Sequence, residues 1–509
     1  MAETEYAIRC EKIRKTFGSV VANDAIDLNV RYGEILALLG ENGSGKTTLM
    51  NMISGIYHPD GGTIYVDGKA ASIQSPLDAQ NLGIGMIHQH FKLVNIFSAM
   101  ENIELGTPGR KLPTKVLREK VMELCRTYGL ETDPEKPVHA MSVSEKQTVE
   151  ILKVLYRGAR ILILDEPTAV LTPQETEKLF AILRQMRKAG CAVIIITHKL
   201  NEVLSISDRV TILRKGKSYG TVKTAEVDVS KLTELMVGHA VTLEIDRPAP
   251  KDPEDILKLV DLTVRRRDGS IALDDVSFSI RTGEILGVAG IAGSGQKELC
   301  ETIAGLLPPT QGAILYKKEN LAGKTPRELI DMGISMSFVP EDRLGMGLVA
   351  GMGMTDNMLL KTYTHGKGPM VDRAPARKMA EELVEKLDIV TAGIEAPVRM
   401  MSGGNVQKVL LGREIESNPD LLITAYPVRG LDINSSYLVY DLLNEQKEKG
   451  VAVVYIGEDL DVLLQLCDRI VVLCHGRVTG DVAAQSVSKE QIGLMMTGES
   501  AQEVLEYGS

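Results

Sequence analysis

The residues with the clearest chemical potential form one glycine-rich segment, Gly40-Glu41-Asn42-Gly43-Ser44-Gly45-Lys46-Thr47-Thr48. Glycines let the backbone turn so that successive N–H groups point at one anion. A helix that starts there adds the positive end of its dipole. The lysine and the first threonine are then placed to reach the outer phosphates of a nucleotide and a bound Mg²⁺. The segment therefore predicts a phosphate-binding loop, with Lys46 on phosphate and the Thr47 hydroxyl on the metal.

Such a loop needs a strand before it and a helix after it. Residues 35–39 form an apolar run that is typical of a short buried strand, and a helical pattern follows the loop. Two further apolar runs end in polar pairs, Asp165-Glu166 and Thr197-His198. Ligands of α/β folds bind at the carboxyl ends of such strands. We therefore expect Asp165, Glu166 and His198 to lie beside the loop, although adjacent acidic residues and lone histidines are more often solvated or structural.

Composition restricts the class of protein. The 509 residues carry a net charge of −10, which argues against a broad surface for nucleic acid. The six cysteines form no C-x2-C pair and adjoin apolar runs, as expected of buried side chains in a reducing compartment. Apolar runs are of strand length, well short of the ~20 residues that cross a bilayer. We expect a cytoplasmic chain that contacts a membrane only through a partner.

The chain contains an internal duplication. Residues 31–40 return as residues 281–290, and Met141-Ser142 returns as Met401-Ser402. The repeat is too long for a solenoid and indicates two similar α/β domains. Three prolines among charges mark a short, semi-stiff linker between them. We predict a first domain over residues 1–245, a linker over 246–254 and a second domain over 255–509.

With these motifs in this order, the chain resembles the ATPase subunits of ABC transporters over essentially its full length. The resemblance implies two tandem P-loop NTPase domains of the α/β class. Each has a mainly parallel core sheet, an antiparallel β subdomain and a helical subdomain that carries the family's signature loop. It also implies ATP as substrate and Mg²⁺ as cofactor.

The resemblance assigns a role to each motif residue of the first domain. Residues Gly40 to Thr48 match the Walker A loop, and Asp165 matches the aspartate that supports the metal. Glu166 matches the glutamate that polarises the attacking water, and His198 the histidine on the γ-phosphate. Gln89 matches the glutamine that joins Mg²⁺ and this water to the transporter interface. Phe17 sits where these ATPases place a ring against adenine, although a lone phenylalanine between strands is usually core.

The second domain departs from the family at the same positions. Glutamine replaces the loop lysine, lysine replaces the metal hydroxyl, and both carboxylates, the glutamine, the histidine and the aromatic ring are lost. The replacements are Gln296, Lys297, Ala425, Tyr426, Glu341, Glu458 and Arg267. The loop glycines remain, so a nucleotide can still bind, but we expect little or no hydrolysis there.

The signature loop shows the opposite pattern. The second domain keeps a close match in Met401-Ser402-Gly403-Gly404-Asn405, whereas Met141-Ser142-Val143-Ser144-Glu145 of the first domain has lost both glycines. Two such ATPase domains pack head to tail in this family, so each nucleotide lies between one Walker loop and the other domain's signature. The resemblance therefore implies one competent composite site, in which Ser402, Gly403, Gly404 and Asn405 cap the nucleotide held by the first domain. Asp432 matches the family's cross-interface aspartate, and Thr172 stands at that position in the first domain.

The function that follows is ATP hydrolysis that powers an ABC importer. Residues 88–94 and 287–293 look more like the nucleoside branch than the simple-sugar branch, which is the alternative. A soluble tandem ATPase acting on ribosomes or DNA, and a regulatory module without turnover, are the remote alternatives. The implied partners are two transmembrane permease subunits and, through them, an extracytoplasmic substrate-binding lipoprotein. We expect no nucleic acid partner, one ATPase chain per transporter, and a peripheral location on the cytoplasmic face of the membrane.

Overall fold

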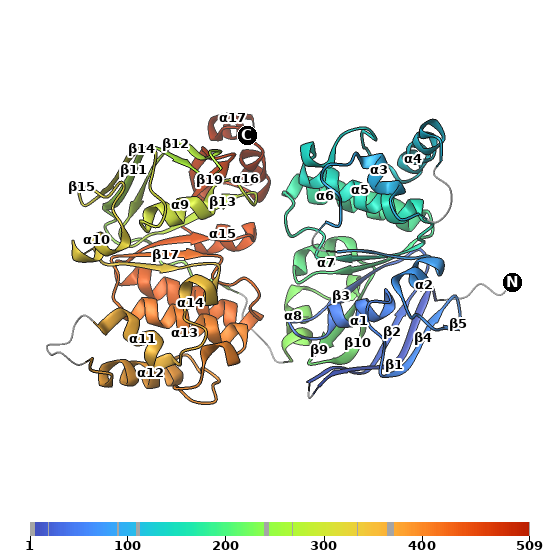
Figure 1. Cartoon of the computed structure of the whole chain (residues 1–509), viewed down its shortest axis with the longest axis horizontal. Helices are drawn as coiled ribbons and strands as arrows, with labels where there is room; N and C mark the ends of the chain where they lie inside the picture. Colours follow the sequence, from blue (N-terminus) through green and yellow to red (C-terminus); the bar gives the residue numbers. More distant parts are fainter. Residues whose placement is uncertain are drawn as a thin grey trace. The chain divides into compact units, whose positions relative to one another are not determined.

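The computed structural model describes residues 6–18, 20–88, 91–107, 112–238, 244–266, 268–332, 334–363 and 371–507. The chain divides into two units, Met1–Leu243 and Glu244–Ser509 (Figure 1). Each unit contains a four-stranded antiparallel sheet, a six-stranded sheet and a set of helices. This architecture confirms the predicted α/β class with two tandem domains.

In the first unit, the strands of the antiparallel sheet lie in the order β2-β1-β4-β5 and those of the larger sheet in the order β10-β9-β3-β8-β7-β6. The larger sheet is parallel apart from the β9–β10 hairpin. The strands are β1 Ile8–Phe17, β2 Val20–Val30, β3 Ile35–Leu39, β4 Gly61–Val66, β5 Lys69–Ala71, β6 Ile84–Ile87, β7 Ile161–Asp165, β8 Ala192–Ile196, β9 Arg209–Arg214 and β10 Lys217–Lys223. The helices are α1 Lys46–Ile53, α2 Pro76–Asn81, α3 Ala99–Glu104, α4 Thr114–Tyr128, α5 Val143–Tyr156, α6 Pro173–Lys188, α7 Leu200–Ile206 and α8 Val229–Val237.

The second unit repeats this plan with sheet orders β12-β11-β14-β15 and β16-β17-β18-β13-β19-β20. Its strands are β11 Asp255–Arg265, β12 Ile271–Arg281, β13 Ile285–Gly290, β14 Gln311–Tyr316, β15 Glu319–Asn320, β16 Met336–Val339, β17 Leu421–Ala425, β18 Ala452–Ile456, β19 Arg469–Cys474 and β20 Arg477–Ala483. Its helices are α9 Gln296–Ile303, α10 Pro326–Asp331, α11 Met354–Thr362, α12 Ala374–Lys386, α13 Gly403–Glu416, α14 Ile433–Glu448, α15 Leu460–Leu466, α16 Lys489–Met496 and α17 Ala501–Tyr507, with a π-helical turn η3 at Arg343–Gly347.

The central parallel strands β3, β7 and β8 of the larger sheet in the first unit are buried on both faces, which explains why they are apolar runs without alternation. Leu36 and Leu38 of β3 face one core with α1 and the antiparallel sheet. Ile35 faces the other core, with the helices that follow β6. All six cysteines are buried and unpaired, as predicted. Within the described ranges, no helix has the length and apolar content needed to cross a bilayer.

Strand register brings the candidate residues to one edge. Leu38 of β3 pairs with Ile196 of β8, and Ile196 pairs with Asp165 of β7. The loops that follow these three strands therefore leave the sheet side by side. The second unit has the same register, because Val288 and Ala425 both pair with Ile456.

Candidate functional site

The glycine-rich loop of the first unit joins β3 to α1. Gly45, the N-cap of α1, has a left-handed φ of 97°, and a Cβ there would lie 2.4 Å from the Ala22 carbonyl oxygen. A Cβ on Gly40 would lie 2.2 Å from the carbonyl oxygen of Leu213. No side chain fits at either position, so these glycines are required by close backbone approach. The N-terminus of α1 carries no side-chain cap, which leaves its N–H groups available to an anion.

Lys46 is the first residue of α1, and its side chain folds back over the loop. Its Nζ donates to the carbonyl oxygens of Gly40 at 2.7 Å and Glu41 at 2.9 Å. Burial lowers the pKa of Lys46, while Glu166, Asp165 and Glu41 oppose this shift. The ammonium group is thus held inside the loop within the field of three carboxylates. Ser44 is buried here as well, and its Oγ has no hydrogen-bond partner among the described residues.

Asp165 ends β7 and Glu166 follows it in a left-handed conformation, with φ of 47°. The Glu166 N–H donates to the Ile196 carbonyl oxygen at 2.9 Å, which fixes this unusual backbone. Burial, and then the neighbouring Glu166, raises the pKa of Asp165 to about 6, while Lys46 opposes the shift. The Glu166 Oε1 lies 3.0 Å from His198 Nδ1, and its Oε2 is buried without a hydrogen-bond partner in the described part of the chain. The structure therefore brings Lys46, Asp165, Glu166 and His198 together.

The donor set at this edge suits Mg²⁺ that arrives with a nucleotide. Among the described residues, no group of three or more histidine, cysteine, aspartate or glutamate side chains is arranged to hold a metal. Mg²⁺ is usually bound through one or two carboxylates together with substrate phosphates, not in an all-protein cage. Asp165 and the exposed Thr47 at the N-terminus of α1 provide one carboxylate and one hydroxyl. These residues fit the cofactor that the sequence implies.

Phe17 is a further predicted residue of the first unit. Phe17 ends β1 with 44% of its surface exposed, and its ring packs edge-to-face on Tyr57 at a centroid distance of 5.3 Å. Because this ring is exposed, Phe17 is not a core residue, as a phenylalanine between strands usually is. Lys15 Nζ also lies 5.5 Å from the centre of this ring. Gln89 lies outside the described residues.

The second unit has the same loop with different chemistry. Gln296 is buried at the start of α9, and its Nε2 donates to the Ile291 carbonyl oxygen at 3.2 Å. A neutral amide thus closes the loop where Lys46 places a charge in the first unit. The side chain of Lys297 is 68% exposed and lies 3.8 Å from Glu301 on the next helical turn. The cation of this loop therefore lies outside the phosphate cradle.

Tyr426 has the backbone of Glu166, with φ of 51° and an N–H that donates to Ile456 O at 2.9 Å. Burial raises its pKa, and Glu458 and Glu341 raise it further, so its phenol stays neutral. Arg429 forms ion pairs with Glu341 and, at 3.6 Å, with Glu458. These two glutamates occupy the positions matched to Gln89 and His198. Aligning the two halves would have revealed Arg429, because Ala169 stands at its position in the first unit.

The predicted signature segment of the second unit leads into the N-terminus of α13, and a side chain added at either of its glycines would meet no close neighbour. Ser402 is the N-cap of α13, and its Oγ accepts from the Asn405 side-chain amide at 2.9 Å. Neither Gly403 nor Gly404 has a positive φ. A Cβ at these two positions would come no closer than 3.4 Å and 3.5 Å to any neighbour. The unit itself therefore imposes no demand for glycine here. Ser402 Oγ accepts from the Asn405 N–H at 3.4 Å, so the N–H groups of Gly403 and Gly404 are the ones offered to an external anion.

The first unit closes the equivalent helix end with its own carboxylate. Ser142 and Glu145 form a capping box at the start of α5, and Glu145 Oε2 accepts from the Ser142 N–H at 2.7 Å. Lys136 lies 2.7 Å from Glu145, and this bond lowers the pKa of the Glu145 carboxyl. The helix end of the first unit thus holds an ion pair, and its carboxylate stands at the position of Asn405 in the second unit. Sequence reasoning missed this role, although the S-x-x-E spacing is a recognisable capping signal.

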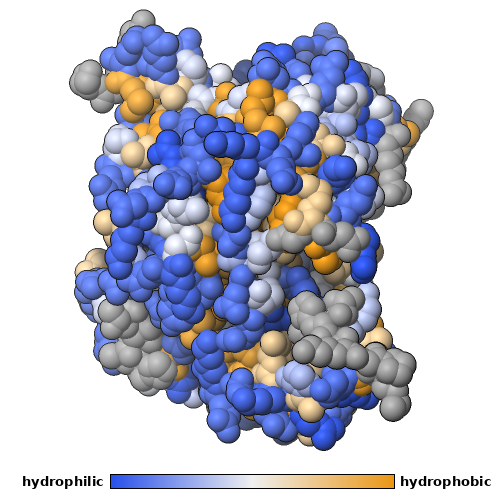
Figure 2. All heavy atoms as spheres, turned by 90° about the vertical axis from the view of Figure 1, so that its left-hand side faces the viewer, coloured by the Kyte–Doolittle hydropathy of each residue, from blue (hydrophilic) through white to orange (hydrophobic). Residues whose placement is uncertain are grey.

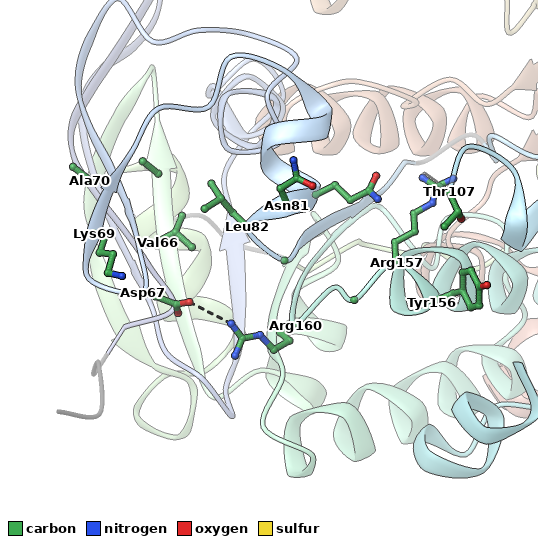
Figure 3. Close-up of a pocket in the computed structure, with 14 residues that line it drawn as sticks. Val66, Asp67, Lys69, Ala70, Asn81, Leu82, Thr107, Tyr156, Arg157 and Arg160 are labelled. Atoms are coloured by element: carbon green, nitrogen blue, oxygen red, sulfur yellow. Dashed lines mark hydrogen bonds and ion pairs between the residues drawn. The ribbon is translucent and has the colours of Figure 1, made fainter. Parts of the chain in front are cut away.

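A hollow in the first unit is separate from this site (Figure 3). Its volume is about 750 Å³, and Gly83 and Arg160, which precede β6 and β7, are among the lining residues. It therefore lies at the opposite edge of the sheet from Glu166. An ion pair of 3.3 Å between Asp67 and Arg160 crosses its wall. None of the predicted site residues lines this hollow.

Comparison with known proteins identifies the same family that the sequence motifs resemble. The family model described as ABC transporter matches residues 23–169 and 273–427. A nucleoside import ATP-binding protein, NupA, of Lactococcus lactis subsp. cremoris is 42% identical over 97% of this chain and 98% of its own. A guanosine import ATP-binding protein, NupO, of Bacillus subtilis is 41% identical over 98% of this chain and 99% of its own. A ribose import ATP-binding protein of Streptomyces avermitilis is 39% identical over 97% and 94%, respectively.

Proposed function

Because this chain belongs to the ABC transporter family, we propose that it is the ATP-hydrolysing subunit of an importer for nucleosides. The observation that carries the proposal is the asymmetry of its two halves. One unit gathers Lys46, Asp165, Glu166 and His198 at a strand edge, and the other leaves a glycine helix end uncovered. Relatives that match the full length of the chain are named for nucleoside or guanosine import.

The proposed reaction is in-line attack of water on the γ-phosphate of ATP. Glu166 accepts or orients the water proton, and its unpartnered Oε2 is available for this contact. His198 holds the γ-phosphate while its Nδ1 stays on Glu166. Lys46 and the N–H groups of the loop stabilise the negative charge that develops on the phosphate oxygens. Mg²⁺, held by Asp165 and Thr47 with Gln89, would supply further charge neutralisation.

We further propose that a complete pocket forms only when Ser402 and the N–H groups of Gly403 and Gly404 cap the nucleotide on the first unit. The uncovered end of α13 supports this assignment, because a helix N-terminus attracts phosphate. The end of α5 supports the complementary assignment, because the ion pair of Glu145 with Lys136 occupies it in place of the two glycines. ATP binding then closes the two units, and hydrolysis reopens them.

The segments after Gln89 and Glu341 are the proposed contacts with the two permeases. Leu105 at the end of α3 and Leu360 on α11 occupy matching positions and are 45% and 44% exposed. The second unit adds exposed Met346, Val349 and Met352. Figure 2 shows hydrophobic patches on an otherwise mostly hydrophilic face. Exposed apolar side chains at matching places in both halves suit apolar permease segments.

The experiment that tests the function uses the transporter assembled from this chain, its permeases and its binding protein. We expect ATP hydrolysis to rise when the binding protein is loaded with guanosine and to stay at its basal rate with ribose. Stimulation by ribose alone would instead favour the sugar importer. Recovery of the native chain with ribosomes or DNA, and not with membranes, would contradict both.

A further inference from the structure

The hollow of Figure 3 lies where three parts of the first unit meet. Its lining comes from the β4–β5 hairpin, from the connection of α2 to β6, and from the segments at the C-terminal ends of α3 and α5. Its volume of about 750 Å³ is typical of small-molecule sites. Apolar side chains such as Val66 and Leu82 alternate in the lining with amides such as Gln80 and Asn81. This mixture suits an organic molecule that also carries polar groups.

Cations outnumber carboxylates in the lining. Three cationic side chains line the hollow, whereas Asp67 is its one carboxylate, and Asp67 pairs with Arg160 at 3.3 Å. Figure 3 shows Lys69 at one end of the hollow and Arg157 beside Thr107 at the other. Neither of these two cations forms an ion pair with any residue that the structure describes. The hollow therefore carries two positive charges that the described chain leaves unopposed.

The Arg157 guanidinium is held in place by the loop that follows α3. Arg157 is the C-cap of α5, and its Nη2 donates to the Leu105 carbonyl oxygen. Gly106 follows with a left-handed φ of 75°, and a Cβ there would lie 3.3 Å from the same Nη2. The glycine thus gives the guanidinium room against the loop. The cation is oriented before any ligand arrives, which reduces the entropy lost on binding.

This end of the hollow also contains polar atoms without partners. Arg157 Nε and Thr107 Oγ1 are buried, and neither has a hydrogen-bond partner among the described residues. Burial lowers the pKa of Arg157. Glu150 opposes this shift, but it forms its own ion pair with Lys153 at 3.6 Å. A charge removed from water is costly unless an opposite charge accompanies it, so the Arg157 end favours an anion from outside the described chain.

Arg160 is fixed from two sides. Its guanidinium carbon lies 5.5 Å from the centre of the Tyr32 ring, and its Nη2 lies 3.3 Å from Asp67. The Tyr32 hydroxyl donates to the other Asp67 oxygen at 2.7 Å. Burial, and then this bond to Asp67, raises the pKa of Tyr32 to about 12, so the phenol keeps its proton. The carboxylate of the lining is thus already bound by two partners and does not neutralise the other cations.

The matching positions of the second unit are acidic or neutral where the hollow is basic. The residues at the positions of Lys69, Arg157 and Arg160 are Glu319, Ser417 and Asp420. Ser417 Oγ bonds only within its own helix end, to the Glu414 carbonyl oxygen at 2.6 Å, and to Ser337 Oγ at 2.8 Å. The one cation of the set, Lys317, pairs with Asp420 at 2.7 Å. The excess of positive charge is therefore not part of the common scaffold of the two units.

We propose that the hollow is a binding site for a phosphate-bearing small molecule, with the phosphate at Arg157 and Thr107. A phosphate monoester carries a charge of about −1.5 to −2 near neutral pH, which complements the two unopposed cations. Its oxygens accept hydrogen bonds from a guanidinium and from a hydroxyl. The apolar part of the lining suits the organic part of such a molecule. This inference is independent of the proposed function, because the hollow lies at the opposite edge of the sheet from Glu166.

The test uses a fluorescent reporter inside the hollow. The chain contains no tryptophan, and Ala70 is an exposed residue of β5 that lines the hollow. The tryptophan fluorescence of Ala70→Trp therefore reports this place and not the loop that holds Lys46. We expect a saturable change when the full chain is titrated with guanosine monophosphate, and none with guanosine. An equal midpoint with inorganic phosphate would identify free phosphate as a sufficient ligand, and a tighter one with the nucleotide would show that the nucleoside part contributes; both support the site.

Charge variants are then compared on the same reporter chain. Arg157→Ser and Lys69→Glu, which introduce the second unit's residues, should each raise the midpoint about tenfold or more, as when a charge-assisted hydrogen bond is lost. Lys120→Glu makes the same change of charge at an exposed position of α4 outside the hollow and should leave the midpoint unchanged. Lys46→Ala should leave it unchanged as well, because this lysine does not line the hollow.

Two further measurements guard against a damaged chain or a blocked site. Thermal melting identifies variants that are only less stable, and if Arg157→Ser does not fold, the exposed Lys69→Glu decides the question. Calorimetric titration of the Lys46→Ala chain with guanosine monophosphate, with and without Arg157→Ser, repeats the comparison without the tryptophan. We expect the same loss of affinity there.

Absence of saturable binding of both guanosine monophosphate and phosphate in both assays would overturn the proposal. Equal binding of guanosine would do the same, and so would a wild-type midpoint in Arg157→Ser and Lys69→Glu. An equal rise in Lys46→Ala or in Lys120→Glu would show that the reporter responds to something other than the hollow and would also overturn it. All these results leave the proposed function intact, because none of them depends on ATP hydrolysis.

Discussion

The loop after β7 and the loop after β17 have the same backbone and opposite chemistry. Glu166 and Tyr426 both adopt a left-handed conformation, and each donates its N–H to the last residue of the neighbouring strand at 2.9 Å. The first presents a carboxylate with one oxygen unpartnered among the described residues, and the second presents a partly buried, neutral phenol. A scaffold fixed by backbone hydrogen bonds thus tolerates complete replacement of its side chains.

The N-termini of α13 and α5, at the signature positions, also differ, and here the second unit is the one that matches the family. α13 begins with two glycines that no neighbour requires, and the first turn of α5 carries a carboxylate that accepts from the N–H of its N-cap, Ser142. The first unit therefore keeps the lysine and carboxylates that the second unit lacks, and the second unit keeps the signature glycines that the first unit lacks. The predictions below test that complementarity.

The largest contrast should come from the two capping serines. Ser402→Glu places a negative charge at the open end of α13, where the account puts the γ-phosphate, and should abolish measurable hydrolysis. Ser142→Glu adds charge at an end that already carries Glu145 and should have a much milder effect. The steady-state ATPase rate of the assembled transporter measures both. Equal losses would show that the two ends are equivalent.

The next contrast compares the two residues with left-handed backbones. Glu166→Gln removes the general base while keeping its size, and turnover should fall at least ~10²-fold. Tyr426→Phe should leave turnover near that of the wild type. Single-turnover hydrolysis, measured beside ATP binding, separates the chemical step from affinity. Survival of turnover in Glu166→Gln would remove this residue from the mechanism.

Lys46→Ala and Gln296→Ala compare the two phosphate cradles. The first removes a cation held inside the loop, and uptake should fall roughly 10²-fold or more, as when a charge-stabilising donor is lost. The second removes a neutral amide that bonds only to its own loop, so most ATPase activity should remain. Uptake of labelled guanosine by cells that carry each variant is the measurement. A strong defect in Gln296→Ala would assign the second cradle a direct role.

The smallest effect concerns an ion pair in which the acidic and basic positions are exchanged between the two units. Asp67–Arg160 at 3.3 Å corresponds to Lys317–Asp420 at 2.7 Å, at the same place in each fold. Arg160→Asp would set two carboxylates together and should lower the free energy of unfolding by roughly 1 kcal/mol. Adding Asp67→Lys should restore it by recreating the second unit's pair. Urea unfolding of the full chain tests this, and a double variant no more stable than the single one would contradict it.

The sequence predicts the scaffold well, because it depends on local patterns. The apolar runs at 35–39 and 192–196 are strands with those bounds, since both are buried on two faces and flanked by glycine or polar residues. The pairs Asp165-Glu166 and Thr197-His198 reach one edge because parallel strands share a direction. The duplication predicts the second unit's plan in the same way.

Contacts between distant side chains could not be predicted in this way. Lys92 meets Glu150 and Lys153 across 58 and 61 residues, and Arg429 meets Glu341 across 88. No local pattern encodes such contacts, since they depend on how the loops pack on the helices. The cap formed by Glu145 is local, and the S-x-x-E spacing from Ser142 to Glu145 is sufficient to predict it.

We propose above that Lys46 of the first unit and Ser402 of the second unit hold the same γ-phosphate. The most direct measurement is an experimental structure of the Glu166→Gln transporter with bound Mg²⁺ and ATP. We expect Lys46 Nζ and Ser402 Oγ both to lie within about 3 Å of the oxygens of the same γ-phosphate. A γ-phosphate on Lys46 that is capped by Ser142, or left without Ser402, would contradict it.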